Sequence, residues 1–573
     1  MAWQCLARTI AGGLWIAGLL FCALASAQEL VLPWDSAPQD IARATLGELQ
    51  GSASAAVWRG GVLVEQGVRR QADGQVERLP DAGPRPLYEI GSISKVFTGL
   101  LLAQAVERGE LSLNDTLGQL LKEQVQFSAP EVAALTLRQL VTHTSCLPRQ
   151  FGGVRGTAVV QQIREATRTQ LWVALAAQHL PQAAPCSAVY SNYAMAVVGE
   201  LLSQRAGKPW SQLVQEQITG PLGMSDTVQM LGAQAPRLQP GFVGAAPGER
   251  WDMQAFSGAG GLRSSMSDLA RFGRAILAGR AGPLGGAAER LVTPLATYYG
   301  GEIGFTVFIL GPPGRRTYLH DGWTGAYRAL LVMAQDTGEV TATATSNGLA
   351  PLPDVQRALA ISRYPVSTTA VPVDGAQLQT VPGTFRVAPD MLIYTAVQDG
   401  RLYVRSTGAS FRAYVSVGPD QFARPAGGAL LQVARDAQGA VVGATLQQGG
   451  RVFKGARAQT PERVPRAFLS LLPPGGADAF VGHYTVVRAF RSNIPFRVQN
   501  VDGQLLVTGG SFRPQPVFPI PSLIDRFQYE NVEAQLQFER DAQGRVSGFA
   551  LHENGELRAT RDKASAAAQA NPP

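Results

Sequence analysis

Three short stretches of this 573-residue chain combine residue types that could do covalent chemistry. The first is "YEIGSISKVFTGLL", which places Lys95 three residues after Ser92 at an apparent helix start. Residues with this spacing share a helix face, so the Ser92 hydroxyl and the Lys95 amine are expected to meet. The chain has 5 lysines against 45 arginines, and only Lys95 follows a serine in this way. A buried lysine can lose its proton and act as a base, whereas an arginine cannot.

The residues around Lys95 predict that its helix face is buried. Ile93, Val96 and Phe97 are apolar, although serine and lysine at this spacing are also common on helix surfaces. A buried lysine without a partner is costly unless it has a task. We therefore predict that Lys95 takes the proton of Ser92 and leaves a nucleophilic oxygen. The start of the helix would favour the negative charge that then develops.

The other two stretches are "YSNYAMAVVGELL" from Tyr190 and "HDGWTGAY" from His320. A Tyr-x-Asn at a helix start can direct the Tyr190 phenol and the Asn192 amide into one cleft. The plain alternative is a capped helix with a tyrosine in the core. For the His320 stretch, the plain alternative is a β-turn that contains a histidine.

An α+β domain would have to position these residues. A hairpin is predicted over 52–68, with strands on either side of Gly60-Gly61. A helix is expected from Ser92 to Arg108, and strands return late in the domain. Strands at both ends of a region, with helices between them, indicate one sheet assembled from distant segments. The other helices are expected around 131–143, 159–178, 192–206 and 266–279, and the late strands at 304–310 and 328–345.

After a linker at 364–377, short alternating strands take over and come twice. The pentapeptide RDAQG begins at Arg435 and again at Arg540, and Asp-Gly turns occur at Asp399 and Asp502. The similar offsets predict duplication of one small barrel or sandwich. The predicted divisions are a signal peptide at 1–27, the α+β domain at 28–365, a linker at 366–378, β domains at 379–458 and 477–561 with a linker at 459–476 between them, and a disordered tail at 562–573.

The composition excludes some classes of function. A net charge of +7 comes from scattered arginines without a basic run, so no nucleic-acid partner is expected. The five histidines are far apart and no Cys-x-x-Cys occurs, so no metal and no cofactor are expected.

The first 27 residues predict export. A charged start, an apolar stretch and Ala25-Ser26-Ala27 form a secretory signal, which implies a periplasmic or secreted protein with no membrane span after signal removal. A retained anchor is the alternative. In an exported chain, Cys146 and Cys186 would lie in an oxidising compartment, which favours a disulfide between them over two free thiols.

Together, the three stretches resemble the serine β-lactamase and penicillin-binding-protein superfamily. The order Ser-x-x-Lys, Tyr-x-Asn and His/Lys-x-Gly is most similar to its branch of class C β-lactamases, D-Ala-D-Ala carboxypeptidases and related esterases. The resemblance covers roughly 45–365 and includes "LTLRQLVTHTSCLPR", "ITGPLGMSDT" and "SGAGGLRSSMSDLARFGRAIL". It implies a β-lactamase/transpeptidase-like domain with an antiparallel sheet and helices. The paired β segments resemble the lipocalin-like domains appended to some members.

The resemblance also implies a role for each matching residue. Ser92 would be the nucleophile, Lys95 its activating partner and Tyr190 the proton relay to the leaving group. Asn192 would bind the acyl side chain of the substrate, and His320 and Gly322 would lie on the strand that docks along the substrate. The backbone N–H groups of Ser92 and Trp323 would form the oxyanion hole. The implied substrates are peptides, esters or β-lactams, with peptidoglycan as a possible polymer partner.

Two departures from the family pattern bear on the substrate. Asp321 stands where threonine or serine is usual, and His320 stands where class C β-lactamases carry lysine, which disfavours efficient β-lactam turnover. Cys146 replaces a usual glycine, and a bridge to Cys186 would brace the loop of Tyr190. A D-Ala-D-Ala-type peptidase of cell-wall peptides is therefore the first expectation. An ester or amide hydrolase, a β-lactamase and a catalytically silent sensor remain alternatives.

Overall fold

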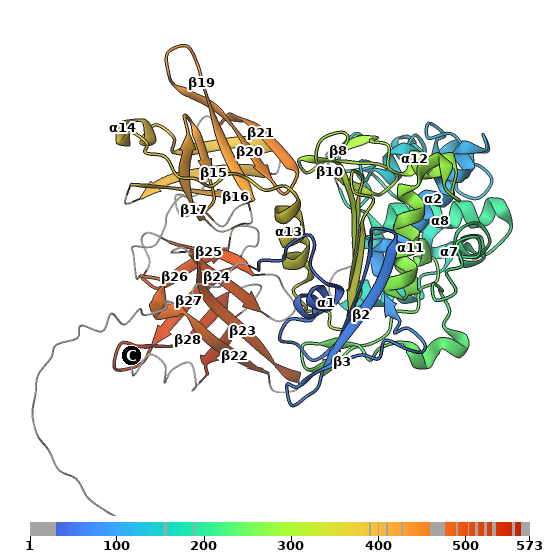
Figure 1. Cartoon of the computed structure of the whole chain (residues 1–573), viewed down its shortest axis with the longest axis horizontal. Coiled ribbons are helices and arrows are strands. Elements are labelled where there is room, and N and C mark those ends of the chain that lie inside the picture. Colours follow the sequence, from blue (N-terminus) through green and yellow to red (C-terminus); the bar gives the residue numbers. More distant parts are fainter. Residues whose placement is uncertain are drawn as a thin grey trace, which may run out of the picture.

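The computed structural model describes residues 30–153, 157–186, 189–388, 391–398, 400–407, 409, 411–425, 428–458, 476–488, 491–501, 504–509, 514–520, 524–529, 534–552 and 556–562. The predicted signal peptide, most of the linker at 459–476, Asp399 of the first Asp-Gly turn, the whole second Asp-Gly turn and the tail after Asp562 lie outside these residues. Figure 1 shows a domain of helices and sheet on the right and two barrels stacked beside it on the left.

A nine-stranded antiparallel sheet forms the middle layer of the first domain, in the order β3-β2-β1-β13-β12-β11-β10-β9-β8. Strand β1 is the first strand of the domain and β13 the last, and the two pair from Ala53–Thr345 to Trp58–Val340. The predicted assembly of one sheet from distant segments is therefore confirmed. The strands are β1 (Gly51–Arg59), β2 (Val62–Arg70), β3 (Val76–Arg78), β8 (Ala296–Tyr298), β9 (Gly301–Ile303), β10 (Phe308–Leu310), β11 (Thr317–Trp323), β12 (Arg328–Ala334) and β13 (Val340–Thr345).

Helices cover both faces of this sheet. On the face toward the barrels lie α1 (Pro38–Leu46) and α13 (Leu352–Arg363), while α11 (Met266–Leu277) packs on the opposite face (Figure 1). Helix α11 buries Met266, Leu269, Phe272 and Ile276, which recur every three to four residues. This spacing forms one apolar stripe, so the helix can lie flat against the sheet.

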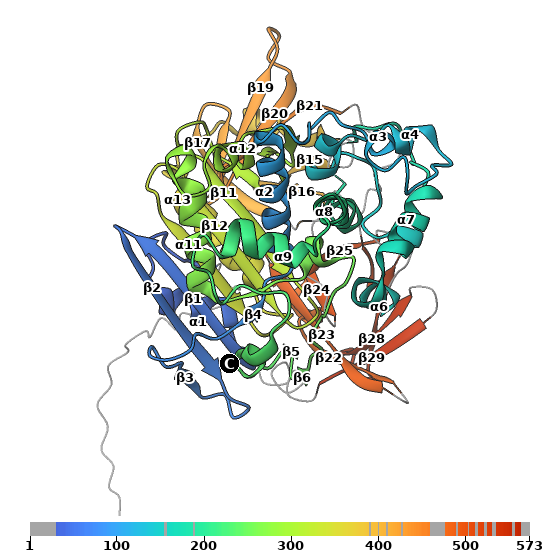
Figure 2. The ribbon, with the colours of Figure 1, turned by 90° about the vertical axis from the view of Figure 1, so that its right-hand side faces the viewer.

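The remaining helices of this domain form a layer beyond α11 (Figure 2), whereas the short α14 (Gly375–Leu378) lies beside the first barrel (Figure 1). Helix α8 (Asn192–Ala206) runs over the predicted range, with Ser191 as its N-cap and Gly207 in the left-handed conformation at its end. The other helices are α2 (Ser94–Glu107), α3 (Leu117–Leu120), α4 (Pro130–Ala133), α5 (Leu137–Val141), α6 (Thr157–Glu165), α7 (Arg168–Ala176), α9 (Trp210–Val214), α10 (Ser257–Gly260) and α12 (Gly286–Leu291), and short two-stranded pairs are β4 (Tyr88–Glu89) with β7 (Arg263–Ser264) and β5 (Phe242–Val243) with β6 (Ala246–Pro247).

Two helices expected to be continuous are each divided in the structure. The segment 131–143 contains α4 and α5, and 159–178 contains α6 and α7. Thr136 and Thr167 accept hydrogen bonds from the backbone three residues later and start a new helix in a capping box. The helical spacing of apolar residues continues through each segment. It therefore does not reveal the threonine at which the second helix starts.

Each of the two C-terminal units is a closed eight-stranded barrel, so a barrel rather than a sandwich is confirmed. Barrel 1 comprises β14 (Gly383–Ala388), β15 (Met391–Gln398), β16 (Arg401–Ser406), β17 (Arg412–Gly418), β18 (Gln421–Ala423), β19 (Ala429–Arg435), β20 (Val441–Gln448) and β21 (Arg451–Arg457). Barrel 2 comprises β22 (Gly482–Arg488), β23 (Arg491–Val501), β24 (Gln504–Gly509), β25 (Gln515–Pro519), β26 (Arg526–Tyr529), β27 (Gln535–Arg540), β28 (Val546–His552) and β29 (Glu556–Arg561).

The RDAQG pentapeptides form the same turn in both barrels. In barrel 1, Arg435 Nε lies 2.9 Å from a carboxylate oxygen of Asp420, and in barrel 2, Arg540 Nε donates to Asp525 over 2.6 Å. Both aspartates have a positive φ, 52° and 56°. The shared ion pair and backbone conformation support the duplication that the repeated sequence predicts.

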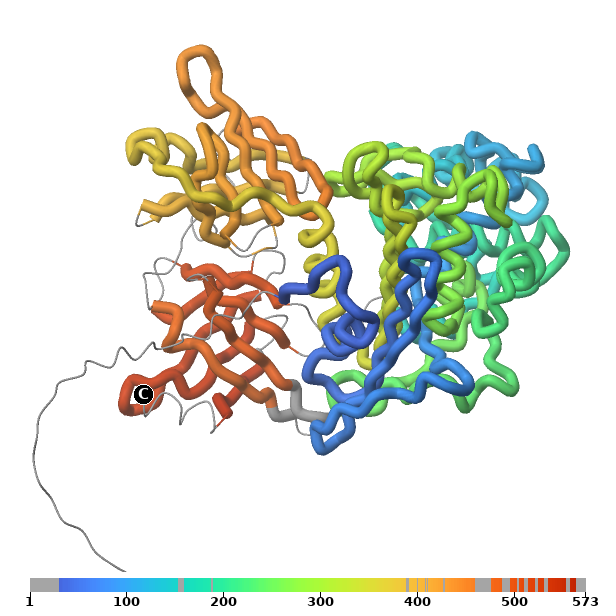
Figure 3. Tube along the Cα trace, in the orientation of Figure 1, coloured from blue at the N-terminus to red at the C-terminus, as the bar shows by residue number. Residues whose placement is uncertain are grey.

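The barrels contact each other through aromatic side chains. Arg405 of barrel 1 lies with its guanidinium carbon 4.6 Å from the ring centroid of Phe518 in barrel 2 and 3.8 Å from that of Tyr394. Figure 3 follows the chain from α13 directly into barrel 1. Throughout the described part of the chain, every helix is too short or too polar to cross a bilayer.

Candidate active site

Ser92 lies in a 3-10 turn, Gly91–Ile93, that leads into α2. The turn replaces the first turn of the predicted helix, yet Ser92 and Lys95 still share a face. The Lys95 Nζ lies 2.9 Å from the Ser92 Oγ. Ser92 is half-buried, so its hydroxyl remains reachable, whereas Lys95 is fully buried.

The contacts of Lys95 suit a neutral amine. Its Nζ donates to two carbonyl oxygens, the side-chain Oδ1 of Asn192 over 2.8 Å and the backbone oxygen of Ala259 over 2.6 Å. A neutral amine has two N–H donors and one lone pair, and both carbonyls can only accept. The two donors are thus used, and the lone pair is left for the Ser92 hydroxyl. Burial holds the pKa of Lys95 well below its usual range, and the positive charge of Arg149 lowers it further.

The backbone before Ser92 is held by a buried ion pair. Glu89 in β4 accepts from Arg263 in β7 over 3.0 Å and from the Trp251 N–H over 2.8 Å. Both ion-pair side chains are almost fully buried. Ile90 N also donates to Leu262 O over 3.0 Å. These contacts fix the segment that carries Ser92 against the segment that carries Ala259.

The Tyr190 ring packs beside Ser92 and Lys95. The Tyr190 ring centroid is 5.0 Å from Lys95 Nζ. Arg149 lies at the same distance from the ring, and the ring of His143 packs 4.5 Å from it. Burial raises the pKa of the Tyr190 hydroxyl, and the Ser92 side chain offsets this rise only in part, so the phenol keeps its proton at neutral pH.

The loop 143–149 supports the segment that carries Tyr190. Val189 N donates to His143 O over 2.8 Å, and Ser191 N donates to His143 Nδ1 over 3.3 Å. Cys146 and Cys186 lie in disulfide geometry with their Cα atoms 5.4 Å apart. Cys146 has a φ of 61°, a conformation that favours glycine. The residue that departs from the family pattern therefore occupies a position where glycine would be unstrained.

His320 is buried beneath the site rather than exposed along a cleft. Its Nδ1 lies 2.6 Å from the Asp321 carbonyl oxygen, which can only accept, so Nδ1 carries the proton. The Nε2 lone pair is buried and has no hydrogen-bond partner among the described residues. Burial lowers the pKa of His320 to about 4, against the opposing effect of the Asp321 carboxylate. The ring is therefore neutral at pH 7.

Gly322 brings β11 against the serine turn. A Cβ at this position would lie 1.9 Å from Ile90 O and 3.2 Å from Ser92 N, so only glycine allows this approach. Thr324 N donates to Tyr327 O, so these two residues form a hydrogen-bonded pair of the antiparallel ladder. Hydrogen-bonded and non-hydrogen-bonded pairs alternate along such a ladder, so the neighbouring pair, Trp323 and Arg328, is not hydrogen-bonded. The N–H of Trp323 therefore points away from β12. Together with the Ser92 N–H in the first helical turn, it can face a common oxygen.

Four groups at this site lie outside the set singled out as catalytic from the sequence. They are the Ala259 carbonyl, Arg149, His143 and the Asp321 carboxylate, which influences the ionisation of Lys95, Tyr190 and His320. All four fall within stretches that carried the family resemblance. The backbone carbonyl left no side-chain signal, and arginine is too abundant in this chain to stand out.

The arrangement can perform acyl transfer. A reachable hydroxyl contacts a neutral buried amine, a protonated phenol packs beside both, and two backbone N–H groups are available next to the hydroxyl. Groups of these types can act as a nucleophile, a base, an acid and oxyanion donors.

Comparisons with known proteins agree with this chemistry. A family model described as Beta-lactamase matches residues 42–363. The D-alanyl-D-alanine-carboxypeptidase/endopeptidase AmpH of Escherichia coli strain K12 is 31% identical over 268 residues, which are 46% of this chain and 68% of AmpH. Penicillin-binding protein 4 of Amycolatopsis lactamdurans is 24% identical over 290 residues, 46% of this chain and 73% of that protein. The solved structure of SurE is 21% identical, with a TM-score of 0.45, and the match covers 72% of this chain and 95% of SurE. Since the family match spans more than half of its length, the chain belongs to the beta-lactamase family and is a serine hydrolase.

Proposed function

We propose that the protein is a D-Ala-D-Ala-type carboxypeptidase that cleaves amide bonds of cell-wall peptides through an acyl-enzyme at Ser92. The observation that carries this proposal is the 2.9 Å contact between Ser92 Oγ and a fully buried Lys95 whose two donors are used by carbonyl oxygens. The name of AmpH, a carboxypeptidase and endopeptidase of D-alanyl-D-alanine, supports the substrate class.

In the proposed acylation step, Lys95 Nζ accepts the Ser92 hydroxyl proton as Oγ attacks the carbonyl carbon of the scissile amide. The carbonyl π electrons move to its oxygen, and the N–H groups of Ser92 and Trp323 bind the oxyanion. Such preorganised donors are worth about 100- to 1,000-fold in kcat each. The low pKa of Lys95 matters because a charged ammonium could not take this proton.

In the proposed collapse step, the oxyanion re-forms the carbonyl and the C–N bond breaks. Tyr190, kept protonated by burial, gives its proton to the leaving nitrogen. The Lys95 ammonium, 5.0 Å from the centre of the Tyr190 ring, returns the proton that it took from Ser92. A water then attacks the Ser92 ester, with the same groups moving protons in reverse.

We assign the remaining predicted residues to binding. Asn192 uses its Oδ1 on Lys95, so its amide N–H groups are free to bind the acyl side chain of the substrate. Neutral His320 keeps positive charge away from the space beneath Tyr190, which favours a neutral Lys95. Gly322 lets the β11 backbone lie along the substrate.

The other candidates share this site. An ester or amide hydrolase would use the same nucleophile on small substrates, and a β-lactamase would add fast hydrolysis of the acyl-enzyme. A silent sensor would bind without turnover. The intact contacts between Ser92, Lys95 and Tyr190 favour an active enzyme over a sensor.

We also propose a periplasmic or secreted location. The segment 1–27 is a predicted signal peptide, and disulfides persist in oxidising compartments. The disulfide geometry of Cys146 and Cys186 supports this location.

Intact mass after brief exposure to benzylpenicillin tests the nucleophile and the class. We expect a persistent adduct on the mature protein and none on Ser92→Ala. Rapid hydrolysis without an adduct would move the assignment to a β-lactamase. Intact penicillin with no adduct, together with cleavage of simple esters, would indicate an esterase, and survival of the esters as well would indicate a sensor.

A further inference from the structure

Barrel 1 reaches the catalytic sheet through the hairpin formed by β20 and β21. The hairpin turns at Gly449-Gly450, both with positive φ, as a tight two-residue turn requires. Two backbone hydrogen bonds dock this hairpin on the sheet edge. Val452 N donates to Gly300 O over 2.8 Å, and Gly311 N donates to Gly450 O over 2.8 Å. The tip therefore joins the turns that precede β9 and follow β10.

Side-chain packing leaves this docking little freedom. A Cβ on Gly300 would lie 2.5 Å from the ring of Phe453 in β21. A Cβ on Gly450 would meet the ring of Tyr364 at 2.6 Å. Since both glycines lie flush against aromatic rings, the backbone position of Arg451, between Gly450 and Phe453, is set on both sides.

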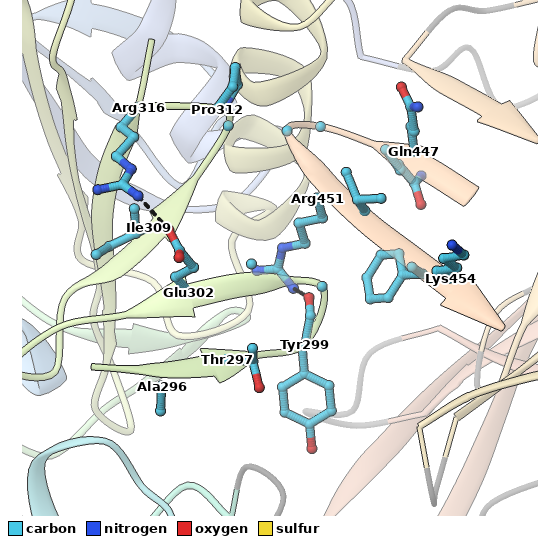
Figure 4. Close-up of a pocket in the computed structure, with 18 of the residues that line it drawn as sticks. Ala296, Thr297, Tyr299, Glu302, Ile309, Pro312, Arg316, Gln447, Arg451 and Lys454 are labelled. Carbon is cyan, nitrogen blue, oxygen red and sulfur yellow. Dashed lines mark hydrogen bonds and ion pairs between the residues drawn. The ribbon is translucent and has the colours of Figure 1, made fainter. Parts of the chain in front are cut away.

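Arg451 projects into a cleft of about 1380 Å³ between barrel 1 and the catalytic domain. Its Nη1 donates to Tyr299 O over a long 3.4 Å, and Figure 4 shows the guanidinium leaning from β21 toward that turn. No carboxylate lies within ion-pair distance of it among the described residues. The neighbouring acid, Glu302, is paired with Arg316 over 2.9 Å. Burial lowers the pKa of Arg451, and the more distant Asp321 carboxylate only partly opposes this.

The same guanidinium lies within electrostatic reach of the catalytic site. The ring of Tyr299, whose carbonyl oxygen accepts from Arg451, packs 5.1 Å from the ring of Tyr298. The Asp321 carboxylate raises the pKa of both Arg451 and Tyr190. Ring contacts trace the path. Tyr298 packs 4.8 Å from Phe308, and Phe308 stacks 4.9 Å from His320. Arg451 therefore lies on the Tyr190 side of the site.

We infer that Arg451 binds the carboxylate of the departing residue, so that barrel 1 completes the substrate site and selects peptides with a free C-terminal carboxylate. This inference rests on the proposed function, in which Tyr190 protonates the leaving nitrogen. A group leaving past Tyr190 moves toward Arg451, and an arginine binds a carboxylate through paired hydrogen bonds. Asp321, which replaces the usual hydroxyl residue, cannot bind a carboxylate, so a cation from elsewhere is needed.

The test compares two peptides that differ at one end only. An acetylated peptide ending in D-Ala-D-Ala and its C-terminal amide are each assayed for kcat/KM with the full-length mature enzyme. We expect the wild type to prefer the free acid. Arg451→Gln should reduce that preference about 10- to 100-fold, the usual worth of a charged hydrogen bond. Arg451→Lys should restore part of it, because the charge remains without the paired geometry.

Lys454→Ala provides the matched control. Lys454 lies on the same strand as Arg451 and lines the same cleft, but its side chain points away from the Arg451 guanidinium and Tyr299 (Figure 4). Its loss should leave the acid-to-amide preference within about threefold, as for an exposed charge screened by salt. Thermal unfolding of each variant checks that the barrel stays docked.

The outcomes separate this inference from the function on which it rests. If the wild type cleaves both peptides equally, or Arg451→Gln keeps the full preference, the carboxylate site is refuted while the peptidase assignment stands. An equal loss in Lys454→Ala would also refute it, since the effect would then belong to the net charge of the cleft. If the wild type cleaves neither peptide, the proposed function fails and the carboxylate site fails with it.

Discussion

Replacing Gly322 by alanine should disable the site while leaving most of the fold intact. The new Cβ would lie 1.9 Å from Ile90 O, 2.8 Å from Ile90 C and 3.2 Å from Ser92 N. All three are backbone atoms, so no side-chain rotation can relieve the overlap. A carbon atom normally lies about 3.5 Å from a non-bonded atom. Because the new Cβ would lie only 1.9 Å from Ile90 O, β11 and the serine turn must move apart by more than about 1 Å.

This displacement acts directly on the oxyanion donors. The N–H groups of Ser92 and Trp323 lie on the two segments that the methyl group would push apart. A misplacement of about 1 Å costs about 100-fold in rate, and loss of one oxyanion donor costs about 100- to 1,000-fold in kcat. We therefore expect kcat for a chromogenic ester to fall by at least about 100-fold. The overpacked contact should lower the free energy of unfolding by about 1–3 kcal/mol.

The assay measures kcat and KM separately for the Gly322→Ala enzyme and for a matched control, Gly375→Ala. Gly375 has open space around its missing side chain and an ordinary backbone conformation, so its variant should behave as the wild type. Thermal unfolding distinguishes a displaced site from a misfolded protein. A Gly322→Ala enzyme that folds and keeps kcat within about threefold of wild type would refute the proposed oxyanion geometry.

Two further predictions concern the base and the loop of Tyr190. Removing the charge of Arg149 by alanine should raise the pKa of Lys95, because that charge now lowers it. Since the neutral amine is the active form, the acid limb of the kcat/KM profile should move to higher pH, and an unmoved limb would contradict Lys95 as the base. Cys146→Ser should lower the free energy of unfolding by about 4 kcal/mol, from the 40-residue loop that the bridge would close. Denaturant unfolding checks the value, and two free thiols in the non-reduced protein would exclude the bridge.

Much of the catalytic region could be predicted because its signals are local. The serine and lysine three residues apart, the capped helix α8 over Asn192–Ala206 and the repeated RDAQG turns each depend on neighbours in sequence. The divided helices show the limit of this reasoning, since a periodic pattern hides a threonine cap within it. His320 lies on β11, the strand expected along the substrate, and the burial of its side chain is a feature that the motif alone does not reveal.

The reactive groups, their order along the chain and the type of each domain could be inferred from local sequence patterns. The burial of these groups and the distances between them depend on how the chain folds. Lys95 is fully buried because segments far apart in the sequence pack around it, and Gly322 matters because β11 packs directly against the serine turn. Arg451 reaches the cleft because a barrel more than 300 residues downstream of Ser92 docks on the sheet edge. Desolvation and close approach depend on segments that meet only on folding, so no local pattern records them.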